Sequence, residues 1–188
     1  MTGFNLAGTS APWVVFVPQG SDEVRRQLAA LEDQGGRVHR FAASDLTTEQ
    51  GVCQAFAETL QFPGYFGRNW DAVVDCLDDL CGAVTGGHVG MAGVITGVDD
   101  RLLDAEHFPD FVSVLCQAAD RANSAVDLDG FPLDRPAVSE HFVFECGEFS
   151  GFGRAAQEKV ARRVEQPDLV VMRGDGFVGA ALDPQEWH

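Results

Sequence analysis

Apolar residues recur along the chain at two periods, which predict strands and helices in alternation. The apolar run at residues 13–17, ended by Pro18, is typical of a buried strand. A helical period follows over residues 22–33 and is stopped by two glycines. Residues 38–42 have the composition of a second strand. The first part of the chain therefore predicts a βαβ unit.

The same patterns predict the remaining elements. Thr47 and Gln50 form a capping box for a helix that extends through Leu60. Pro109 is expected at the first position of a helix that ends at Asn123. Further expected elements are strands at 88–96 and 141–146, a helix at 154–164, and a hairpin of 169–172 with 177–182 around an Asp-Gly turn. This alternation predicts an α/β fold with helices packed on a small, mostly parallel sheet.

One expected helix, which begins at residue 70, has an apolar and an acidic face. Its apolar residues recur at i, i+3, i+4, i+7 and i+10: Trp70, Val73, Val74, Leu77 and Leu80. Four aspartates lie on the other side: Asp71, Asp75, Asp78 and Asp79. The last two stand near the negative end of the helix dipole, where each carboxylate costs about 0.3–1 kcal/mol. This placement indicates that the acids serve something other than helix stability.

A short aromatic loop leads into this helix. It contains Tyr65 and Phe66 between Gly64 and Gly67. The two glycines are expected to give the loop a left-handed turn geometry. Asn69 is expected to cap the helix that follows.

The loop and the helix together carry a thirteen-position signature, Tyr-(Tyr/Phe)-Gly-x-Asn-x-Asp-Ala-x-x-Asp-Cys-Leu. The chain matches it at nine positions: Tyr65, Phe66, Gly67, Asn69, Asp71, Ala72, Asp75, Cys76 and Leu77. In this the chain resembles the barstar family, intracellular protein inhibitors of secreted ribonucleases of the barnase type. The resemblance implies a barstar-like α/β domain over residues 37–147. Residues 1–36 are then a strand–helix extension and residues 148–188 a helix-and-hairpin addition, all forming one compact unit.

The resemblance also implies a surface that binds a partner. Asp75 looks like the central carboxylate that enters the phosphate site of the enzyme, and Asp71 looks like a second carboxylate facing its cations. Tyr65 is similar to an aromatic contact, and Gly67 lets the loop backbone approach the enzyme.

Four further positions complete the expected partner-binding surface. Asp78 and Asp79 are expected on its rim. Where the family has an interfacial tryptophan on this helix, the chain has Val74. Where the family has a contacting glutamate on the later helix, the chain has Gln117. The two departures favour a nuclease related to barnase but different from it.

Composition and charge exclude some classes of partner and indicate where the protein is located. The formal net charge of −16 argues against nucleic acid and anionic membranes as partners. The acid is concentrated, because residues 71–110 hold nine carboxylates and one arginine. The five cysteines form no C-x-x-C pair, no apolar stretch reaches about 18 residues, and the first residues lack the basic region of a signal peptide. These features predict free thiols and a cytoplasmic location.

Other chemistries have weaker signals. Gly151, Gly153 and Ala156 match a dinucleotide fingerprint, but four residues separate the preceding strand from the first glycine, where the turn should be immediate. The five histidines have no zinc-site spacing. Acidic doublets such as Asp99-Asp100 could hold a divalent metal, yet such doublets are more often solvated surface. No cofactor, no metal and no enzymatic activity are therefore expected.

Three hypotheses follow from the sequence. The first is an intracellular inhibitor that blocks the active site of a basic ribonuclease with the acidic helix and the aromatic loop. The alternative is a barstar-like binding module or immunity protein directed at another basic protein or toxin. The third hypothesis is a small enzyme that uses the loop at Gly151.

Overall fold

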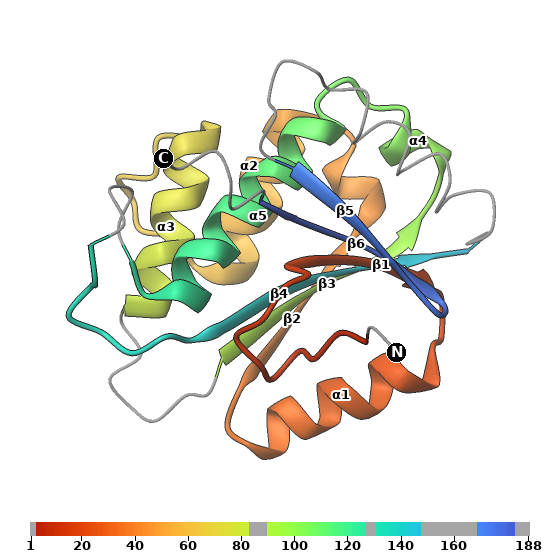
Figure 1. The fold of residues 1–188 in the computed structure, drawn as a ribbon. Coiled ribbons are helices and arrows are strands. Elements are labelled where there is room, and N and C mark those ends of the chain that lie inside the picture. The colour runs from red at the N-terminus through yellow and green to blue at the C-terminus, as the bar shows by residue number, and fades with distance from the viewer. Residues whose placement is uncertain (1–2, 83–89, 127–130, 148–168, 183–188) are drawn as a thin grey trace.

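The computed structural model describes residues 3–82, 90–126, 131–147 and 169–182 (Figure 1). Its strands are β1 (Val14–Pro18), β2 (Arg37–Ala42), β3 (Gly90–Val98), β4 (Ser139–Cys146), β5 (Leu169–Gly174) and β6 (Phe177–Leu182). Its helices are α1 (Asp22–Asp33), α2 (Glu49–Leu60), α3 (Trp70–Gly82), α4 (Asp100–Leu103) and α5 (Phe108–Ser124), with a short 3-10 helix at Ala43–Leu46.

The six strands form one sheet in the order β2-β3-β4-β1-β6-β5. The first four strands in this order are parallel to one another, and β6 and β5 are antiparallel to their neighbours. This arrangement confirms the predicted α/β fold with a mostly parallel sheet. Both strands of the expected hairpin are present, and Gly176 takes the left-handed conformation that their turn requires, with φ 79°.

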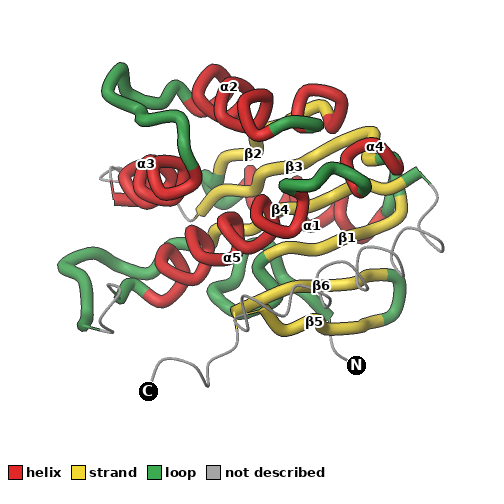
Figure 2. The backbone as a smooth tube through the Cα atoms, turned by 90° about the horizontal axis from the view of Figure 1, so that it is seen from above, coloured by secondary structure: helices red, strands yellow, loops and turns green. Residues whose placement is uncertain are grey.

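Strand β1 lies in the interior of the sheet, between β4 and β6 (Figure 2). Trp13 anchors its start on both sides, since its N–H donates to Ala180 O and its carbonyl accepts from Phe142 N, each at 2.9 Å. A strand with neighbours on both edges and cover on both faces has no polar side, which explains the continuous apolar run. Strand β1 therefore extends the same sheet as β2, β3 and β4, and the expected three-part division of the chain stays a prediction.

The helices cover the two faces of the sheet unequally. Helices α2, α3 and α5 lie on one face and α1 on the other (Figure 1). The first face holds the larger core, with Phe16, Phe56, Phe111, Phe142 and Phe144 in contact through their rings. The second core is mostly aliphatic, includes Phe177, and packs beneath α1. No helix among the described residues is long and apolar enough to cross a membrane.

Two helix starts differ from their predictions by one residue. Thr48, not Thr47, caps α2, accepting a hydrogen bond from Gly51 N at 3.0 Å. Thr47 ends the preceding 3-10 helix instead, and its hydroxyl donates to Ser44 O at 3.4 Å. Helix α5 begins at Phe108, so Pro109 is its second residue. The helix expected at 154–164 and the fingerprint at 151–156 lie outside the described residues.

Deleting residues 1–36 tests the interior position of β1. The deletion exposes the edges of β4 and β6 and removes the helix that covers the second core. We expect the fragment 37–188 to lose the cooperative thermal transition of the full chain, measured by circular dichroism. A fragment that melts cooperatively within a few degrees of the full chain would show that β1 is dispensable.

Candidate functional site

Helix α3 is held by its apolar side. Val73 and Leu77 are fully buried in the larger core. The Trp70 ring is half-buried and stacks against Phe111 of α5, with ring centroids 6.2 Å apart. A second stacked neighbour, His107, lies 6.1 Å away and is fixed by its contact with Leu46 O at 3.0 Å. These contacts leave only one side of α3 open to solvent.

The loop before α3 is built differently from its expected form. A turn closed by a hydrogen bond from Phe66 N to Pro63 O, at 3.0 Å, carries Gly64 without a positive φ. Gly67 has no positive φ either, and Arg68 takes the left-handed conformation instead, with φ 52°. The expectation of left-handed glycines is thus wrong, because this turn can close with ordinary backbone angles. Asn69 Oδ1 accepts from Ala72 N at 2.8 Å, as N-cap side chains do.

A hydrogen bond joins the loop to the C-terminal end of the acidic face. Tyr65 is 76% exposed, and its hydroxyl donates to Asp79 Oδ2 at 3.3 Å. Large aromatic side chains are among the commonest anchors of protein interfaces. The aromatic ring and the C-terminal half of α3 therefore belong to one continuous surface.

Two aspartates at the centre of α3 face arginines of this same chain. The Asp75 side chain is 73% exposed, and its Oδ1 lies 3.4 Å from Arg121 Nη1 of α5. The Asp78 side chain is only 30% exposed and forms an ion pair with Arg135. Asp75 is thus exposed to solvent, whereas Asp78 is half-buried and paired with an arginine of the same chain. Asp71 is exposed, with no ion pair to any residue that the structure describes.

One of the expected contact residues is buried, and another is half-buried. Val74 is buried in the core shared with α5, since it lies one helical turn after Trp70 on the apolar side. Its side chain cannot contact a partner, which corrects that expectation. Gln117 is half-buried, and its Nε2 donates to Ser113 Oγ of the same helix at 3.2 Å.

The sequence pattern did not single out the two arginines. Arg121 lies four residues after Gln117, so helical spacing would have placed both on one face of α5. Arg135 lies in the segment between α5 and β4, 57 residues from Asp78, and no local pattern predicts that pairing. The structure therefore places two arginines beside the acidic residues that the sequence pattern had identified.

A buried carboxyl group lies behind the end of α3. Glu140 at the start of β4 is fully buried, and its Oε2 accepts from Cys81 Sγ at 2.9 Å. Its backbone carbonyl accepts from Asn123 Nδ2 at 2.9 Å. Burial is the main cause that raises the pKa of Glu140 to about 7. Burial also raises the pKa of the Cys81 thiol, so this cysteine is a neutral hydrogen-bond donor rather than a nucleophile.

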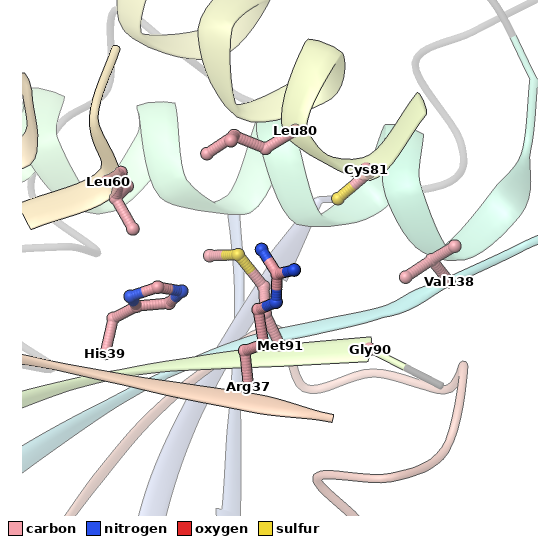
Figure 3. A pocket seen from close by; sticks show the side chains of 8 residues that line it. All are labelled: Arg37, His39, Leu60, Leu80, Cys81, Gly90, Met91 and Val138. Carbon is pink, nitrogen blue, oxygen red and sulfur yellow. The ribbon is translucent and has the colours of Figure 1, made fainter. Parts of the chain in front are cut away.

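Cys81 also lines a small cavity (Figure 3). It has a volume of about 60 Å³ and is lined in part by Arg37, His39 and Met91. This volume is far below the several hundred Å³ of a typical ligand site. Among the described residues, no cluster of three or more histidine, cysteine or acidic side chains could hold a metal ion.

Comparison with known protein families gives a match. A family model described as Barstar (barnase inhibitor) matches residues 36–131, just over half of the chain. The matched segment runs from the residue before β2 through α5 and includes the aromatic loop and α3. No curated protein and no solved structure matches.

The two ion pairs of α3 predict that replacing aspartate by alanine lowers the free energy of unfolding by different amounts at the two positions. Asp78→Ala should lower the free energy of unfolding by about 2 kcal/mol, because it leaves the largely buried Arg135 without its carboxylate. Asp75→Ala, one turn earlier, should cost about 1 kcal/mol or less, as exposed ion pairs do. Urea unfolding of both variants measures the difference. Equal costs would mean that Asp78 is not a structural residue.

The buried Glu140 predicts a pH dependence of stability. Its pKa is raised from 4.5 to about 7 on folding, so its contribution is fully present below pH 4.5 and is lost as the pH rises through 7. The loss amounts to about 3 kcal/mol. Glu140→Gln keeps an acceptor for Cys81 and should remove this loss, so the variant should be the more stable protein at pH 8. The free energy of unfolding of both proteins is measured between pH 4.5 and 8. The same change with pH in both proteins would contradict the prediction.

Proposed function

The chain belongs to the barstar family, and we propose that it is an inhibitor that blocks the active site of a basic ribonuclease. The inhibitory surface consists of the Tyr65 loop and the solvent-facing carboxylates of α3. One observation carries the proposal: a helix anchored in the core holds Asp71, Asp75 and Asp79 out to solvent. The family is one of inhibitors, not enzymes.

The charge of this surface suits a nuclease active site. Such a site binds phosphate with cationic side chains, and carboxylates on a rigid helix neutralise those cations without offering a bond to cleave. The protein's net charge of −16 would also attract a basic partner and accelerate encounter. The proposed contacts are Tyr65, Gly67, Asp71, Asp75 and Asp79, with Gln117 at the edge of the surface.

A second candidate is an immunity protein for a different basic protein or toxin. The burial of Val74 favours it, because this chain offers no aromatic side chain at the position where the family has an interfacial tryptophan. Both candidates place the protein in the cytoplasm, in keeping with five cysteines that are all free and all buried.

The two candidates are separated by what the protein captures. The tagged chain is used to pull partners from the native cell and its secretome, and each captured protein is purified and assayed for ribonuclease activity with and without added inhibitor. Barnase serves as a reference enzyme in the same assay. Stoichiometric inhibition of a captured ribonuclease supports the first candidate, and capture of a basic protein without ribonuclease activity supports the second.

Asp75→Ala is the most informative single substitution for this surface. Removing one member of a charge pair that becomes buried in a complex costs about 2–5 kcal/mol of binding, a range that rests in part on complexes of this family. We expect Asp75→Ala to weaken inhibition of the captured ribonuclease by that amount and Asp71→Ala to act in the same direction. Asp33→Ala, on α1 at the opposite face of the sheet, is the matched charge control. Inhibition by Asp75→Ala at the level of this control would exclude the acidic helix as the inhibitory surface.

A further inference from the structure

Two arginines underlie the acidic face of α3. Arg121 of α5 has a side chain only 19% exposed, and Arg135 after α5 has one only 14% exposed. Each pairs with one aspartate of α3, Arg121 with Asp75 and Arg135 with Asp78. The same arrangement therefore occurs twice, one helical turn apart.

The two ion pairs differ in how much of the carboxylate remains accessible to a partner. Arg121 engages only Oδ1 of Asp75, at 3.4 Å. Within the described part of the chain, no hydrogen bond or ion pair reaches Asp75 Oδ2. An ionised carboxylate accepts several hydrogen bonds, so Oδ2 can bind an external cation while Oδ1 keeps its internal one. Asp78, by contrast, is half-buried beside Arg135 and has little surface to offer.

Three features favour the position of Arg121 beside Asp75. It lies in the last turn of α5, where the helix dipole favours a cation. Its backbone carbonyl accepts from Ala125 N at 3.1 Å and from Arg135 Nη2 at 3.5 Å. Its side chain is only 19% exposed, so moving it out into solvent would give up the packing of its aliphatic part against the protein. We therefore expect Arg121 to stay beside Asp75 when a partner binds.

We propose that Arg121 is a positioning residue of the inhibitory surface, holding Asp75 by one oxygen so that the other is presented to a cation of the partner. The inference rests on the proposed function. An exposed aspartate samples several rotamers, and a complex must select one of them. Arg121 selects that rotamer before the partner arrives, which lowers the entropy cost of binding.

Positioning and net charge act on different rate constants. Removing Arg121 makes the surface more negative, which raises the association rate for a basic partner. Removing it also frees Asp75, which weakens the contact once formed and raises the dissociation rate. The two effects can therefore be measured separately.

The first experiment needs no partner. Three-bond couplings between the Hα and Hβ protons of Asp75 are measured by NMR in the wild-type protein, in Arg121→Met and in Arg121→Lys. We expect one dominant rotamer in the wild type, averaged couplings in Arg121→Met and partial recovery in Arg121→Lys. Averaged couplings in the wild type, or identical couplings in wild type and Arg121→Met, would overturn the proposal.

The second experiment measures binding kinetics with the captured ribonuclease or with barnase. Arg121→Met should raise the dissociation rate about tenfold, and Arg25→Met on α1 is the control with the same charge change. In an Asp75→Ala background, Arg121→Met should have no further effect on the dissociation rate. A dissociation rate equal to that of the control, or the same increase with and without Asp75, would refute positioning.

The two experiments also separate this inference from the proposed function. If the wild-type protein inhibits no ribonuclease, the proposed function fails, and the NMR couplings alone decide whether Arg121 orders Asp75. If the protein inhibits a ribonuclease and Arg121→Met behaves as the control, the function stands and the role of Arg121 fails. Thermal unfolding of each variant confirms that the fold is intact.

Discussion

The burial of one side of α3 fixes the geometry of the surface opposite. Val73 and Leu77 are fully buried, and Trp70 stacks on α5. The helix cannot rotate without bringing these side chains into water, at a cost of about 1.5–3 kcal/mol for each large apolar group. Asp71 and Asp75 are therefore held in defined positions by residues that never touch a partner. The rigidity of the proposed binding surface is a property of the core beneath it.

Charge is arranged in layers behind that surface. Exposed carboxylates lie outermost, Arg121 and Arg135 lie beneath them, and the buried Glu140 lies deeper still. Of the two acids that oppose the helix dipole, Asp78 is offset by Arg135, whereas Asp79 accepts a hydrogen bond from Tyr65. Asp78, which looked like a surface acid in the sequence, belongs to this internal arrangement.

Local patterns predicted much of the fold and part of the site. Helix α1 has its expected bounds, and the apolar side of α3 lies in the core, because helical periodicity is visible in a short stretch of sequence. Long-range pairings were not visible. The place of β1 depends on contacts such as that of Val14 with Phe142, and the pairing of Arg135 with Asp78 joins a connector to a helix. No local period encodes either one.

The central claim is that the Tyr65 loop and the acidic side of α3 form the surface that meets a basic ribonuclease. The most direct measurement is a map of amide chemical-shift changes in the isotope-labelled protein when the captured ribonuclease is added. The account predicts that the largest changes fall on residues 63–79, with smaller ones near Arg121. Changes centred on α1, or on the hairpin of β5 and β6, with residues 63–79 unaffected, would contradict it.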